Sequence, residues 1–152
     1  MKNYFTLFAA TISLLIISCN KDQKLISEIA GEYTIQSIIN YNKGEEIPVN
    51  FQTGKIFFEN CEMKDEGGGS CTGWFEFDGL QKVTFQYYTR KEQGAKTIKI
   101  TNPNSFKEPI ILGYYEFKKE GNLLIFSGKK GSEGSSNGVS FSEYSDIKLI
   151  KN

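Results

Sequence analysis

The chain has 152 residues, 18 basic and 18 acidic side chains, three cysteines and no histidine. This length suits one domain, and a formal net charge of zero argues against nucleic-acid binding, which needs a basic surface. Without histidine, the chain cannot build a Ser-His-Asp triad, a Cys-His dyad or a histidine zinc site. The 15 glycines, 3 prolines, 12 phenylalanines and 8 tyrosines are typical of a turn-rich β protein.

The first 19 residues have the features of a lipoprotein signal peptide. Lys2 supplies a short positive region, and the uncharged stretch at 4–17 is too short to cross a bilayer comfortably. The stretch leads into Ile16-Ile17-Ser18-Cys19, which resembles a bacterial lipobox. That resemblance implies removal of residues 1–18 and lipidation of Cys19. The alternative is a buried apolar helix that carries a cysteine by chance.

The residues after Cys19 give an indication of where in the cell the protein is located. Lys21 and Asp22 match the surface-export signal of Bacteroidetes lipoproteins, in which a lysine and acidic residues follow the cysteine, whereas Gln23 stands at the second acidic position. We therefore expect a protein of the cell envelope, attached to the outer membrane by its N-terminal lipid. Exposure on the cell surface and a position facing the periplasm are the two alternatives.

Two further cysteines, Cys61 and Cys71, lie in a compartment that permits disulfides and allow a single pairing. The loop between them contains three consecutive glycines, so closing it removes much disorder, about 3 kcal/mol in the chain-entropy model. Two thiolates without histidine make a poor metal site, and the Cys-x-x-Cys spacing of redox pairs is absent. The sequence predicts a structural disulfide, with two free thiols as the alternative.

The rest of the chain predicts a short helix followed by strands. Apolar spacing indicates a helix at 22–30, and Tyr33, Ile35, Ile39 and Tyr41 fall on one face of the first strand. The strands are expected at residues 31–41, 55–62, 71–78, 80–89, 97–101, 110–118, 123–127 and 141–151, with an extended piece at 47–49. No helix is long enough for a parallel crossover. An all-β, eight-stranded antiparallel up-and-down barrel fits best, and a β-sandwich is the alternative.

This order of features resembles the bacterial, Bacteroidetes-type lipocalin-like lipoproteins, which join a lipobox, a short helix, a Gly-x-Trp start and eight antiparallel strands. Here the start is Gly31-Glu32-Tyr33, and Trp74 lies in the third strand instead. The resemblance divides the chain into a signal peptide (1–18), a lipidated cysteine with linker and helix (19–30), and a lipocalin-like β-barrel domain (31–152). It implies a calyx that binds an apolar small molecule.

Aromatic side chains with inward strand phase form the candidate ligand site. They are Tyr33, Phe58, Phe75, Phe77, Phe85, Tyr87, Tyr115 and Phe117. The alternative is that these rings simply fill the barrel as its core. Trp74, Tyr88 and Tyr114 have the opposite phase, where exposed rings can stack on sugars or dock a protein.

No arrangement of residues indicates catalysis. Glu62, Asp65 and Glu66 flank the glycine-rich loop and could hold Ca²⁺ weakly, but their spacing is not that of an EF-hand, and a solvated loop is the alternative. Strand phase offers no facing carboxylates for glycoside hydrolysis. The sequence therefore predicts a non-enzymatic protein without cofactor or metal, which binds a small apolar ligand. The alternative is a surface module that binds a protein or glycan through loops and exposed aromatics.

Overall fold

The computed structural model describes residues 21–49, 53–62, 69–102, 111–128, 135–136, 139–140 and 143–152. The predictions for the signal peptide, for lipidation of Cys19, and for Asp65 and Glu66 lie outside these residues. Within the described ranges, no helix is both long and apolar enough to cross a bilayer.

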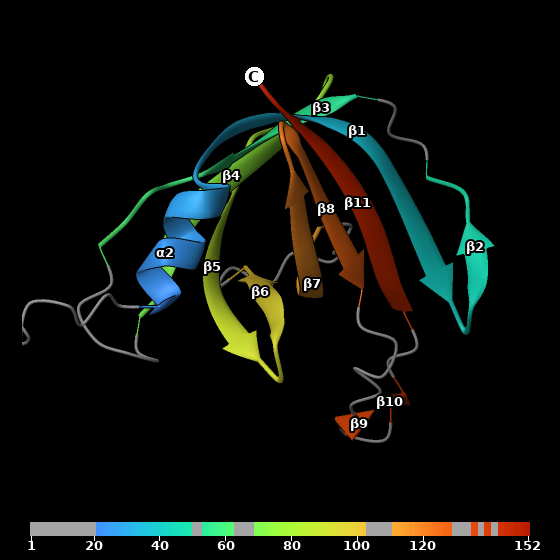
Figure 1. The fold of residues 1–152 in the computed structure, drawn as a ribbon. Helices are drawn as coiled ribbons and strands as arrows, with labels where there is room; N and C mark the ends of the chain where they lie inside the picture. Colours follow the sequence, from blue (N-terminus) through green and yellow to red (C-terminus); the bar gives the residue numbers. More distant parts are fainter. Residues whose placement is uncertain are drawn as a thin grey trace, which may run out of the picture.

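Eight antiparallel strands close into a barrel (Figure 1). In chain order they are β1 (Gly31–Asn42), β3 (Gly54–Phe58), β4 (Cys71–Phe77), β5 (Val83–Glu92), β6 (Ala95–Thr101), β7 (Gly113–Glu120), β8 (Leu123–Gly128) and β11 (Glu143–Lys151). Each strand pairs with the next of this series, and pairing of β11 with β1 closes the sheet. The prediction of an all-β antiparallel barrel is confirmed, and the sandwich alternative is wrong.

Three shorter strands lie outside the barrel. β2 (Glu45–Ile47) pairs with the end of β1, where the sequence predicted only an extended piece at 47–49. The turn between them holds Lys43 at φ 52° and Gly44 at φ 86°, the two positive φ angles of a type I′ hairpin. β9 (Ser135–Ser136) and β10 (Val139–Ser140) pair with each other. In Figure 1, β2 lies along the outer side of β1.

Along the strands of the barrel, buried residues alternate with more exposed ones, as expected for strands with one face toward a core. In β4, Cys71, Gly73, Phe75 and Phe77 are buried, and the residues between them are half-buried or exposed. The same alternation runs through β3, β5, β7 and β8. The inward phases predicted for the aromatic residues of β3, β4, β5 and β7 are therefore confirmed.

β1 departs from its predicted phase because it contains a β-bulge between Ile35 and Ser37. Tyr33 and Ile35 face the interior, as expected. Beyond the bulge, Ile38 lies opposite the fully buried Ile147, so the inward set becomes 38, 40 and 42. The prediction that Ile39 and Tyr41 share the inward face with Tyr33 is wrong, because one extra residue reverses the direction of every later side chain.

The predicted short helix is present as α2 (Lys21–Ile29). Leu25, Ile26 and Ile29 form its apolar face and are buried in the same core as the barrel rings. The helix ends before Gly31, which has φ 124°, a conformation that side chains with a Cβ rarely adopt. We call the barrel end that α2 contacts the helix end, and the opposite end the far end.

Lysines from two strands satisfy carbonyls at the end of α2. Lys119 Nζ of β7 donates to Glu28 O at 2.7 Å, and Lys151 Nζ of β11 donates to Ala30 O at 3.1 Å. Lys96 of β6 pairs with the Glu28 carboxylate at 2.6 Å. Cations at a helix C-terminus bind its free carbonyls and its negative dipole end. These contacts fix the helix across the ends of three strands.

Gly73 of β4 is required by the packing of one ring. A Cβ at this position would lie 2.4 Å from two carbons of the Phe85 ring and 2.5 Å from Phe57 O. Phe85 is fully buried, so its ring has no free space to enter. The glycine therefore permits the close approach of the ring.

We expect Gly73→Ala to lower the free energy of unfolding by about 1–3 kcal/mol, because the added methyl overpacks the core. Urea denaturation of the purified protein measures this. Thr72→Val, at the exposed neighbouring position, is the control and should change little. Adding Phe85→Leu to Gly73→Ala should recover part of the loss, and an unchanged midpoint for Gly73→Ala would contradict the packing described.

Candidate functional site

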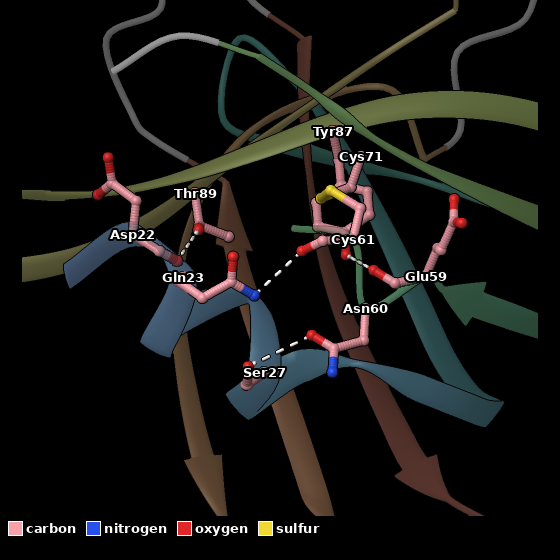
Figure 2. The surroundings of a disulfide bond; sticks show 9 residues. All are labelled: Asp22, Gln23, Ser27, Glu59, Asn60, Cys61, Cys71, Tyr87 and Thr89. Atoms are coloured by element: carbon pink, nitrogen blue, oxygen red, sulfur yellow. Dashed lines mark hydrogen bonds between the residues drawn. A yellow bond between two sulfur atoms is a disulfide. The ribbon is translucent and has the colours of Figure 1, made fainter. Parts of the chain in front are cut away.

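The predicted disulfide is present. It joins Cys61, which follows β3, to Cys71, the first residue of β4. Cys61 and Cys71 are bonded, with their Cα atoms 5.6 Å apart (Figure 2). Gln23 Nε2 of α2 donates to Cys61 O at 3.0 Å, and Ser27 Oγ donates to Asn60 Oδ1 at 3.3 Å. The disulfide therefore belongs to the contact between the helix and the barrel, which supports a structural role.

All eight aromatic residues of the predicted ligand site lie in one buried cluster, and none is more than 8% exposed. Phe75 at 8% and Phe77 at 4% lie on the part of β4 that approaches the far end. Tyr115 lies near the start of β7, also toward the far end. The other five, Tyr33, Phe58, Phe85, Tyr87 and Phe117, lie deeper, toward the helix end.

The helix half of the interior is packed with rings. Phe58 of β3 contacts Tyr33, Phe85 and Tyr87, with ring centroids 5.2–6.1 Å apart. It also contacts Phe126 of β8 at 5.8 Å, although β3 and β8 are not neighbours in the sheet, so this contact crosses the interior. In the helix half of the barrel, the rings therefore form the core, which was the alternative to a ligand site in the sequence analysis.

Phe126 is the central residue that the sequence analysis missed. It is fully buried and contacts Tyr115 at 5.5 Å and Phe117 at 6.4 Å, in addition to Phe58. The strand at 123–127 was predicted, but which of its side chains face the interior was not. The alternation of Leu124 and Phe126 with Ile125 and Ser127 was the available signal, and Leu123 at the strand start obscured it.

Three buried tyrosine hydroxyls differ in their partners. Tyr87 Oη donates to Glu59 O, and Tyr115 Oη donates to Ile111 O at 2.9 Å. Tyr33 Oη is the one buried side-chain polar atom in the described ranges without a hydrogen-bond partner. An unsatisfied buried hydroxyl destabilises the folded state by about 1–3 kcal/mol.

Burial raises the pKa of all three phenols. The pKa of Tyr33 rises to about 12, through burial first and the nearby Glu28 carboxylate second. Burial also raises the pKa of Tyr87, with a further contribution from Glu59. In Tyr115, burial raises the pKa and a hydrogen bond with Ser145 opposes the rise. These groups therefore stay neutral in the folded protein under physiological conditions.

Polar side chains enter the interior only near the far end of the β1–β11 pair, among the residues described on these two strands. Asn40 lies opposite Ser145, and Asn42 lies opposite Glu143. Ser145 is 7% exposed, and its Oγ donates to Asn40 Oδ1 at 2.7 Å. Asn40 and Ser145 therefore form a hydrogen-bonded polar pair beside the aromatic cluster. On these two strands, the interior therefore carries polar side chains near the far end, beside the rings of Phe75, Phe77 and Tyr115.

The outer wall carries aromatic pairs of its own. Phe57 and Trp74 stack across β3 and β4 with centroids 5.8 Å apart, and Lys82 Nζ lies 3.9 Å from the centre of the Trp74 ring. Tyr41, turned outward by the bulge in β1, stacks on Tyr144 of β11 with centroids 4.7 Å apart. The predicted outward phase of Trp74, Tyr88 and Tyr114 is confirmed, because all three are only half-buried. The inward residues beside them, Gly73, Phe75, Tyr87, Thr89 and Tyr115, are buried.

The described residues contain no group of three or more Cys, Asp or Glu side chains placed to hold a metal ion. Of the residues in the predicted calcium loop, only Glu62 is described.

We expect Tyr33→Phe to leave the free energy of unfolding at pH 7 unchanged or to raise it, because the variant removes an unsatisfied hydroxyl. Unfolded tyrosine ionises near pH 10, whereas the folded group ionises near pH 12. Ionisation of Tyr33 therefore leaves the free energy of unfolding unchanged below pH 10. Above pH 10 the free energy of unfolding falls, and the loss is complete once the pH has risen through 12. Tyr33→Phe should lessen that alkaline loss.

Denaturant unfolding at pH 7 and at steps from pH 9.5 to 12 measures both effects. Tyr115→Phe is the matched control, since it leaves Ile111 O without its donor and should lower stability at pH 7 by about 1 kcal/mol. A loss of that size in Tyr33→Phe as well would show that the Tyr33 hydroxyl has a partner.

Comparisons of the chain with protein-family models, with curated proteins and with solved structures found no match. The resemblance to lipocalin-like lipoproteins therefore stays a prediction from the order of sequence features.

Proposed function

We propose that this protein is a lipid-anchored, non-enzymatic binding protein of the cell envelope that takes a small, largely apolar ligand into its barrel. The observation that carries the proposal is the closed barrel with its buried aromatic cluster, which is compatible with ligand binding. Because the helix half is packed with rings, the ligand would bind toward the far end, against Phe75 and Phe77. This assigns the deeper five aromatic residues of the predicted site mainly to the core.

The lipid anchor rests on the lipobox-like sequence that ends at Cys19. Only Asn20 separates Cys19 from the first residue of α2. With about 3.5 Å per extended residue, a lipid on Cys19 would hold the helix end within about 10 Å of the membrane surface. The far end would then point away from the bilayer, which is the orientation a protein needs to exchange a ligand with its surroundings.

The anchor predicts the mass of the mature N-terminus. In the protein isolated from its own host, the first peptide should begin at Cys19 and carry fatty-acyl groups. Cys19→Ser should carry no acyl group and should retain residues 1–18, because the cysteine is the modified group. Peptide mass spectrometry measures both outcomes.

The double variant Cys61→Ser/Cys71→Ser is the control, since it removes the disulfide and should leave the acylated N-terminus unchanged. A host-derived protein that begins at Met1, or that carries no acyl group at Cys19, would contradict the anchor.

Ligand binding predicts that the protein isolated from its host carries a small molecule. Native mass spectrometry should show a species heavier than the denatured, acylated chain, and the excess should disappear on denaturation. Phe77→Leu should lower the occupancy, because it removes a ring near the far end. Trp74→Ala, which changes an outward ring of the same strand, should retain the small molecule.

A surface interaction module is the second candidate, favoured by the stacked Phe57–Trp74 and Tyr41–Tyr144 pairs on the outer wall. Recovery of a protein or glycan that is lost in Trp74→Ala and kept in Phe77→Leu would favour this function over barrel binding.

A further inference from the structure

We infer that the Cys61–Cys71 disulfide is a redox-controlled latch that holds α2 on the barrel, and that its reduction by a dithiol releases α2 while the barrel strands stay paired. The inference goes beyond the proposed ligand binding and does not depend on it. Three features of the helix end carry it: the contacts of α2 with the segment that holds Cys61, the unequal burial of the two cysteines, and a buried hydroxyl near the helix that has no partner.

The N-terminal half of α2 rests on the segment that carries Cys61 (Figure 2). Gln23 Nε2 donates to Cys61 O at 3.0 Å. One turn later in the helix, Ser27 Oγ donates to Asn60 Oδ1 at 3.3 Å. Both acceptors belong to neighbouring residues, so a movement of these two residues away from the barrel removes both hydrogen bonds from the helix at once.

The disulfide joins this segment covalently to the barrel wall. Glu59 N donates to Thr72 O of β4 at 3.0 Å, whereas residues 60–62 belong to no strand. The sequence between Cys61 and Cys71 contains three consecutive glycines, so breaking the bond restores a large conformational entropy to this connection. Reduction therefore favours departure of residues 60–62 from the wall, while the strand pairing up to Glu59 remains.

The two cysteines differ in exposure, which decides where a reductant reacts. Cys61 is half-buried, whereas Cys71 is 1% exposed. A dithiol therefore attacks the sulfur of Cys61: its thiolate forms a mixed disulfide with Cys61, and Cys71 leaves as a thiolate that takes up a proton. The second thiol of the reductant then displaces Cys61. The reductant is oxidised to a disulfide, and the protein gains two electrons and two protons.

A buried hydroxyl near α2 favours release of the helix. Tyr33 Oη has no hydrogen-bond partner within the described ranges. The Glu28 carboxylate of α2 contributes to the raised pKa of Tyr33, which places this phenol near the helix. When α2 leaves, water reaches this part of the interior and can hydrogen-bond the hydroxyl. The unsatisfied hydroxyl therefore destabilises the docked helix, and the latch opposes that effect.

Release of α2 also changes the link between the barrel and the membrane, a consequence that rests on the proposed lipid at Cys19. The nine residues of α2 span about 14 Å as a helix and up to about 32 Å when extended. Reduction therefore lengthens the tether and frees the helix end of the barrel from the membrane surface.

Hydrogen exchange of the protein isolated from its host, with and without dithiothreitol, tests the inference. Mass spectrometry follows peptides from α2 and from β11. We expect reduction to speed exchange of the α2 amides at least tenfold and to change exchange of the β11 amides less than twofold. Iodoacetamide should label Cys61 before Cys71, because Cys61 is the more exposed residue.

Variants assign the release to the latch. Cys61→Ser/Cys71→Ser should show the fast α2 exchange without any reductant. Gln23→Leu/Ser27→Ala removes the two helix contacts and keeps the disulfide, so α2 should exchange faster before reduction, and reduction should then add less than in the unmodified protein. Thr53→Val, which removes a side-chain hydrogen bond at the far end, is the control and should respond to reduction like the unmodified protein.

The inference is overturned if the disulfide of the folded protein resists dithiothreitol, if α2 keeps its protection in both the reduced protein and the double-serine variant, or if the strands lose protection together with α2. Protection kept throughout would leave a purely structural disulfide, and a joint loss would mean that the bond stabilises the whole fold. These outcomes are separate from the proposed function, since a small molecule detected by native mass spectrometry shows binding whether or not reduction releases α2.

Discussion

The pairing of β1 with β11 is the interaction on which the rest of the structure depends. It joins the first strand of the barrel to the last, across more than 100 residues of chain, and it closes the sheet. Without it, the sheet would present two open edges and the ring cluster would lose one wall. The pairing also contains the bulge between Ile35 and Ser37, so closure and the change of side-chain direction occur in the same element.

The bulge changes which side chains of β1 face the interior. Before it, β1 contributes Tyr33 and Ile35 to the core. After it, Asn40 enters the interior opposite Ser145, and Tyr41 turns outward to stack on Tyr144. The helix end is closed by α2, by lysine contacts to its last carbonyls and by the disulfide next to it. These contacts hold α2 against the helix end of the barrel.

The candidate site was only partly predictable. Period-two alternation identified the inward rings correctly on β4, β5 and β7, because those strands have no irregularity. It could not separate rings that form core from rings near the far end, since both have the same phase. That distinction depends on contacts across the barrel, such as Phe58 with Phe126, between strands that are not adjacent in the sheet. The polar pair of Asn40 and Ser145 was not predicted, because a bulge leaves no clear signal in this sequence.

The sequence by itself determined the all-β class and the short helix before Gly31, because local periodicity and backbone propensity carry that information. It also supplied the expectation of a lipid anchor at Cys19. The structure decided between barrel and sandwich, and between a Cys61–Cys71 disulfide and two free thiols. The tertiary structure decided which side chains meet inside the barrel. A single extra residue in β1 reverses the phase of every later position, and only pairing with β11 reveals where that residue is accommodated.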